Sequence, residues 1–156
     1  MKAMNSREHT DWVPLDRTYT HRIHTLMKLA DRITQIAYEQ ESGIPAHEAR
    51  CLAAIGNFAP LSVKDLARCA NLDKAQASRA AQALVEKGLI LKESSPTDGR
   101  GVVLNLSEQG AEVWMRTMRL VTRRNQEITA CLNEEEARQL DLILDKLVAH
   151  ARCDQK

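Results

Sequence analysis

The stretch 62–84, SVKDLARCANLDKAQASRAAQAL, contains the clearest structural signal in the chain. Ser62 is a good helix N-cap, and Asp73 with Gln76 three residues later fits a second capped helix start. Asn71 lies between the two apolar-periodic runs, and asparagine tolerates the left-handed backbone of a sharp turn. We therefore predict two short helices joined by a tight turn, which is the helix-turn-helix pattern.

The second predicted helix presents a polar face without acidic residues. Arginine pairs with guanine edges and glutamine with adenine edges, while lysine and serine suit phosphates. We expect this face to enter the major groove of DNA, with contacts from Lys74, Gln76, Ser78, Arg79 and Gln82. For a helical hairpin taken alone, an ordinary solvated helix face is the alternative.

The helical spacing of apolar residues ends at Gly88. Glycine is a plausible helix stop because it takes the left-handed conformation at a helix end at little cost. Two β-prone runs follow at 89–93 and 102–106, with the turn-forming sequence SSPTDGRG between them. This predicts a β-hairpin with Arg100 near its tip, where an arginine suits a narrow minor groove. A surface ion pair between Arg100 and Asp98 is the alternative, and the two interpretations are compatible.

Helix, turn, helix and basic hairpin together form a winged helix, and long helices with apolar seams flank it. We expect a mainly α fold with a small β-hairpin wing. It divides into an N-terminal arm (1–16), a dimerisation helix (17–44), a winged helix-turn-helix (45–106) and C-terminal dimerisation helices (107–152). The central unit is too small to cover these seams, so they predict a homodimer, and a monomer whose helices fold back on its own core is the alternative.

Several motifs resemble the MarR family of bacterial transcriptional regulators. They are Ser78-Arg79, LVEKGLI at 84–90, DGR at 98–100, and LNLS at 104–107 followed by Gly110. Ser107 replaces the family's usual threonine, and the wing has Arg100 where many members carry two or three arginines. The resemblance implies a winged-helix homodimer that binds an inverted-repeat operator on double-stranded DNA.

The resemblance also implies a ligand-responsive repressor. Many members release DNA when a small aromatic acid occupies the junction between the dimerisation helices and the winged helix. An anion in an apolar cleft needs a cation or a hydrogen-bond donor, and we expect Tyr19, His21, Arg22 and Arg50 to line such an effector site. We expect no other cofactor.

The net charge of +1 excludes a polycation that binds nucleic acid through bulk charge alone. DNA binding would then depend on individually placed contacts. The low charge also leaves open a second function class, a winged-helix adaptor for protein interactions that does not bind DNA.

The sequence contains no pattern typical of an enzyme. The helix motif at 47–51, HEARC, has Cys51 where a zinc protease needs its second histidine. The four cysteines lack metal-ligand spacing, so we expect reduced and mostly buried thiols and no metal. No apolar run approaches the roughly 20 residues of a membrane span, and no signal peptide is visible, so we expect a cytoplasmic protein without a membrane partner.

Overall fold

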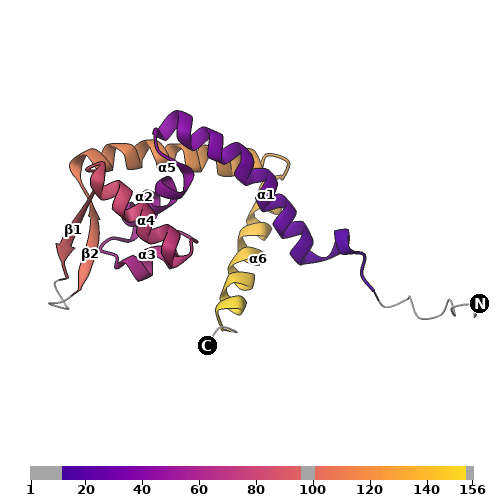
Figure 1. Cartoon of the computed structure of the whole chain (residues 1–156). Helices are drawn as coiled ribbons and strands as arrows, with labels where there is room; N and C mark the ends of the chain where they lie inside the picture. Colours follow the sequence, from indigo (N-terminus) through magenta and orange to yellow (C-terminus); the bar gives the residue numbers. More distant parts are fainter. Residues whose placement is uncertain (1–11, 96–100, 154–156) are drawn as a thin grey trace, which may run out of the picture.

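The computed structural model describes residues 12–95 and 101–153. The elements are η1 (Leu15–Arg17), α1 (Tyr19–Ala37), η2 (Tyr38–Ser42), α2 (Ala46–Phe58), α3 (Val63–Cys69), α4 (Lys74–Glu86), β1 (Ile90–Ser94), β2 (Val102–Leu106), α5 (Glu108–Ile128) and α6 (Glu134–Cys153). In Figure 1, α2, α3, α4 and the hairpin gather on one side of α5, while α6 projects from its far end. The predicted fold class, mainly α with a hairpin wing, is confirmed.

The core forms around α2, which packs against α3, α4, α5 and β2. It is aliphatic, as expected for a chain with one phenylalanine. The largest fully buried apolar side chains are Leu52, Ile55, Leu66, Leu84, Ile90, Leu104 and Leu120. Each helix of the winged helix contributes at least one of them, so α4 is held by the same core as the hairpin.

The two strands pair antiparallel, with Ile90 opposite Leu106 and Ser94 opposite Val102. The first strand begins one residue later than predicted. Leu89 is excluded from it because its N–H donates to Leu84 O at 2.9 Å and so completes the end of α4. Gly88 takes the left-handed backbone at this point, with φ of 70°.

The first long helix ends in one π-helical turn, η2, before Gly43 (φ 72°) stops it. The predicted stop at this point is confirmed, but the π turn was not expected. It turns Tyr38 and Ser42 into the core, and Ser42 meets the buried Thr117 hydroxyl of α5 at 3.2 Å. The end of α1 is therefore fixed to α5.

The helices α1 and α6 bury none of their residues in the protomer. Their apolar side chains lie exposed: Leu26 is 57% exposed on α1, and Leu144 is 47% exposed on α6. Within residues 12–95 and 101–153 the chain thus leaves two long apolar seams uncovered, as the sequence predicts.

All four cysteines are free thiols, but the expectation that they are mostly buried is wrong. Cys131 and Cys153 are exposed because Cys131 lies in the turn between α5 and α6 and Cys153 is the last residue of α6, both away from the core. Burial raises the pKa of the Cys51 thiol to about 12. In the described ranges, no helix combines the length and apolarity of a membrane span, and no group of three His, Cys, Asp or Glu residues is placed to hold a metal.

Candidate functional site

The helix-turn-helix is built from α3 and α4, and side-chain caps hold both helix starts. Ser62 Oγ accepts the Asp65 N–H at 3.1 Å, and Asp73 Oδ1 accepts the Gln76 N–H at 2.7 Å. The Gln76 side chain closes the box by accepting the Asp73 N–H. Between the helices, Asn71 adopts a φ of 52°. The predicted caps and turn are confirmed.

The first turns of α4 expose most of the side chains that the sequence predicts to contact DNA. Ala77, Ala80, Ala81 and Leu84 face the core, which leaves Lys74, Gln76, Ser78 and Arg79 exposed. The side chains of Lys74, Ser78 and Arg79 form no hydrogen bond or ion pair with another residue of the described ranges. Their polar atoms are therefore free to meet bases and phosphates.

Gln82 differs from the other four, because its side chain is engaged within the protein. Its Nε2 donates to Glu86 Oε1 at 2.9 Å, and Lys92 Nζ donates to its Oε1 at 3.1 Å. The sequence pattern assigns Gln82 to the DNA-facing surface and does not indicate its contact with Lys92. Strand alternation offered a signal, since Lys92 is two residues from the buried Ile90 and shares its face.

The far end of α4 is anchored to α2 by a partly buried ion pair. Lys87 Nζ lies 2.5 Å from Glu48 Oε2, and the Glu48 side chain is 6% exposed. The hairpin that follows is joined to the core by Leu104, which exchanges backbone hydrogen bonds with Leu61. The predicted minor-groove residue Arg100 lies outside the described residues, as does Asp98.

A cavity of 550 Å³ lies where α1, α2, α3 and α5 meet. Met27, Phe58, Met118 and Val121 supply apolar walls, and Arg50, Tyr38 and Asn57 supply polar groups. Arg50 Nη2 donates to Asp31 Oδ1 of α1 at 2.7 Å. Burial raises the pKa of Tyr38, so its hydroxyl is protonated and able to donate at neutral pH.

Arg50 also lines a smaller, polar cavity of 370 Å³, which lies against the N-terminal end of α2. Gln76 and Leu72, at the start of the recognition helix, form part of its wall. Arg50 therefore shares a cavity with Gln76, a member of the capping box of α4.

Of the four predicted effector residues, Arg50 alone lines the larger cavity. Tyr19, His21 and Arg22 lie exposed in the first turn of α1. Met27, which does line the cavity, is eight residues from Tyr19, or about 12 Å along the helix. Within one protomer the structure does not bring these three residues together with Arg50. Tyr38 and Asn57 also line the cavity, and nothing in the sequence pattern indicates them as effector-site residues.

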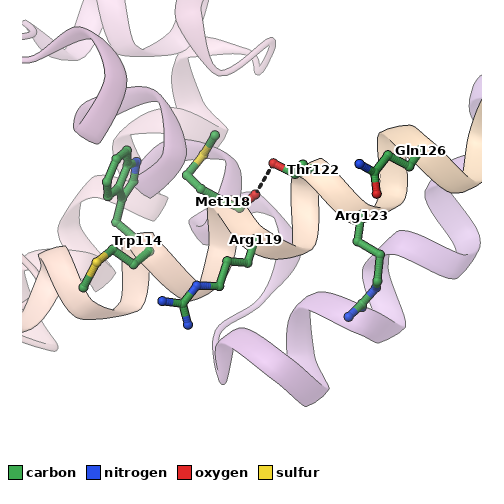
Figure 2. Close-up of a pocket in the computed structure, with 7 residues that line it drawn as sticks. Trp114, Met118, Arg119, Thr122, Arg123 and Gln126 are labelled. Atoms are coloured by element: carbon green, nitrogen blue, oxygen red, sulfur yellow. Dashed lines mark hydrogen bonds between the residues drawn. The ribbon is translucent and has the colours of Figure 1, made fainter.

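A third hollow of 430 Å³ is a groove along α5 (Figure 2). Trp114 and Met118 point to one side of the helix, while Arg119 and Arg123 point to the other. The Trp114 indole lies against Gly56 of α2, and its buried N–H has no acceptor in the described part of the chain. All the described residues that line this groove belong to α5, so the multi-walled cavity at Arg50 is the better enclosed of the two.

Comparison with known proteins shows a family resemblance over the central part of the chain. The MarR family profile matches residues 42–101, from the end of η2 to the residue before β2. The multiple antibiotic resistance protein MarR of Escherichia coli (strain K12) is 28% identical over 137 residues, which are 87% of this chain and 92% of that protein. The family profile and this relative agree with the resemblance to the MarR family that the sequence motifs carry.

A second relative of this chain is described as a transcriptional regulatory protein for the hcr operon of Thauera aromatica. It is 32% identical over 96 residues, which are 62% of this chain and 58% of that protein. The chain therefore spans less than two thirds of that relative's length.

Solved structures of MarR-family proteins share the fold. A MarR/EmrR family transcriptional regulator from Acinetobacter sp. ADP1 matches with a TM-score of 0.80 at 28% identity, over 92% of this chain and 100% of that chain. A cysteine-to-serine mutant of E. coli MarR, complexed with operator DNA, matches with a TM-score of 0.69 at 27% identity, over 82% of this chain and 91% of that chain. These relatives are transcriptional regulators and not enzymes, which agrees with the expectation from sequence.

Proposed function

We propose that this chain is a MarR-family regulator that binds an inverted-repeat operator as a homodimer and that a small aromatic acid releases it. The observation that carries the DNA-binding part is the exposed start of α4, where Lys74, Ser78 and Arg79 face solvent with no partner in the described ranges. These residue types suit phosphates and guanine edges. The E. coli relative complexed with operator DNA supports this assignment.

In the proposed complex, α4 lies in the major groove. Arg79 reads a base edge, and Lys74 and Ser78 contact phosphates, with Gln76 beside them at the helix start. The wing residue Arg100 enters the adjacent minor groove. Such a complex forms on a chromosome, so we expect the protein to work in the cytoplasm.

The homodimer is supported by the two helices that bury nothing. The exposed seam of α1 includes Ile23, Leu26 and Ile33, and that of α6 includes Leu144 and Leu147. Covering both seams with a second copy produces an isologous interface, which in obligate dimers commonly buries about 2,000–5,000 Å². Two-fold symmetry then sets two recognition helices about 34–36 Å apart, one turn of DNA.

The effector proposal rests on the cavity at Arg50. An aromatic acid would place its ring against Met27, Phe58 and Val121, and its carboxylate at the Arg50 guanidinium. To bind there it must compete with Asp31 for Arg50. Because Arg50 lies on α2 between this cavity and the start of α4, occupancy favours a different placement of the recognition helices, and DNA is released by a shift in population.

Selection of bound duplexes from a random pool tests the DNA-binding proposal. We expect an enriched inverted repeat with half-sites one helical turn apart. A salt titration on that duplex should give a log–log slope of about −0.9 per phosphate contacted. No enrichment, with no binding to any duplex at low salt, would favour the adaptor function instead.

A further inference from the structure

Two linked hydrogen bonds at the C-terminal half of α4, the proposed recognition helix, connect it to the hairpin. Lys92 of β1 donates to the Gln82 carbonyl oxygen at 3.1 Å, and the Gln82 amide nitrogen donates to Glu86 at 2.9 Å. The two charged neighbours fix the amide orientation. A flipped amide would set its NH₂ against the ammonium and its oxygen against the carboxylate.

Strand geometry explains why Lys92 reaches α4. Lys92 pairs with Leu104 across the hairpin, so both side chains lie on the same face. Leu104 and the preceding inward residue, Ile90, are fully buried in the core. Lys92 is the next residue on that inner face and is exposed. The Lys92 side chain therefore lies at the edge of the core, where it contacts Gln82.

We infer that Gln82 is a positioning residue for DNA binding, which holds the hairpin at a fixed angle to the recognition helix and does not read a base. The inference rests on the proposed DNA-binding function. To read an adenine edge, a glutamine needs both its oxygen and its NH₂. Here each already has a charged partner, and hydrogen bonds to charged groups are stronger than neutral ones.

The physical benefit is pre-organisation. A winged helix contacts DNA with the helix and the hairpin together, so a hairpin that moves freely must be ordered at the moment of binding. Loss of the connection therefore weakens binding to all duplexes by a similar factor. From the ordinary net strength of such bonds we expect a loss of about three- to tenfold.

Two variants separate positioning from base reading in the full-length protein. Gln82→Ala should weaken binding to the selected operator and to single-base variants of it by the same factor, with an unchanged base preference. The exchanged pair Gln82→Glu with Glu86→Gln keeps the net charge, an acceptor for Lys92 and a donor at position 86. It should restore most of the affinity, although a carboxylate cannot replace the NH₂ that an adenine contact needs.

A change of base preference at one position per half-site in Gln82→Ala, with no recovery in the exchanged pair, would overturn the inference. Amide hydrogen exchange of the free protein adds a measurement that needs no DNA. Gln82→Ala should speed exchange in β1, and the exchanged pair should slow it again. Unchanged exchange in β1 would also overturn the inference. If exchange responds as expected but the unmodified protein binds no duplex, the proposed function fails and the connection between helix and hairpin stands.

Discussion

The Arg50 guanidinium of α2 donates to the Asp31 carboxylate of α1 at 2.7 Å, and this ion pair joins the first long helix to the winged helix. Both side chains are partly exposed, at 34% and 41%, so the pair contributes at most about 1 kcal/mol to stability. Its position matters more than its strength. Arg50 lines the 550 Å³ cavity, and any anion that binds there draws on the same guanidinium.

Replacement of Arg50 should separate effector binding from stability. Arg50→Met keeps the aliphatic stem and removes the cation. We therefore expect the binding of salicylate, used here as a small aromatic acid, to weaken about tenfold or more when measured by calorimetry. The free energy of unfolding should change by about 1 kcal/mol or less. Arg22→Met is the matched control, since Arg22 is exposed on α1 and does not line the cavity. Equal loss in both variants would favour a site at the start of α1, and no loss in either would remove Arg50 from the effector site.

Arg79 is the residue that we expect to read a base. Arg79→Ala should cost about 1–3 kcal/mol of binding free energy and relax preference at one position per half-site. Competition binding with a library of single-base operator variants measures both effects. Lys74→Ala serves as the comparison, because a phosphate contact weakens all duplexes alike and lowers the salt slope by about one. The same behaviour from Arg79→Ala would make it a phosphate contact.

The seam on α6 should control assembly. Leu144→Glu places a charge in the expected interface, so we expect monomers by sedimentation velocity at micromolar protein and a loss of operator binding. Leu142→Glu is a control of the same chemistry, because two residues turn the helix by about 200° and set Leu142 on the opposite face. Monomers from Leu142→Glu and dimers from Leu144→Glu would show that the wrong face of α6 was assigned to the interface.

The features that the sequence predicted correctly are those set by a few neighbouring residues. The Asp73–Gln76 box, the Asn71 turn and the Gly88 helix end all follow from local hydrogen bonding and backbone preference. The apolar seams also depend only on spacing along a helix. For this reason the helix-turn-helix and the hairpin were placed to within a residue.

Features that depend on the angle between elements were missed. Gln82 and Lys92 are ten residues apart, and their contact depends on how the hairpin packs against α4. Asp31 and Arg50 are nineteen residues apart, and their contact depends on how α1 and α2 are placed on either side of η2. Helical periodicity assigns a residue to a face, but it does not say which neighbour that face will meet.

The contact between η2 and α5 should give the protein a pH-dependent stability. The Arg123 guanidinium donates to Glu41 and holds the pKa of that carboxyl below its usual value. A carboxyl whose pKa is lower in the folded state stabilises the fold above its unfolded pKa, and this contribution is lost as the pH falls through the folded pKa. Urea unfolding at fixed protein and salt concentration should therefore show a steeper loss of stability below about pH 5 in the unmodified chain than in Glu41→Gln. Glu39→Gln, a nearby exposed carboxylate outside this pair, should follow the unmodified chain, and parallel curves for all three would contradict the prediction.

Gly110 occupies a helix position where alanine would ordinarily be stabilising, and the structure predicts the opposite. A Cβ at this position would lie 1.8 Å from Leu89 O, where the first turn of α5 passes the start of the hairpin. The neighbouring contacts leave little room to move. Ser107 Oγ donates to Gly88 O at 2.6 Å, and the Ser107 N–H donates to Leu89 O.

Gly110→Ala should therefore lower the free energy of unfolding by about 3 kcal/mol, because the overlap is with backbone and not with a flexible side chain. The same change in an unhindered helix would raise it by up to about 1 kcal/mol. Denaturant unfolding of Gly110→Ala beside Glu112→Ala, an exposed position one half-turn away, isolates the steric effect from helix propensity. A neutral or stabilising result at Gly110 would mean that α5 can separate from the hairpin at little cost, and the wing would then not be held at a fixed position against α5.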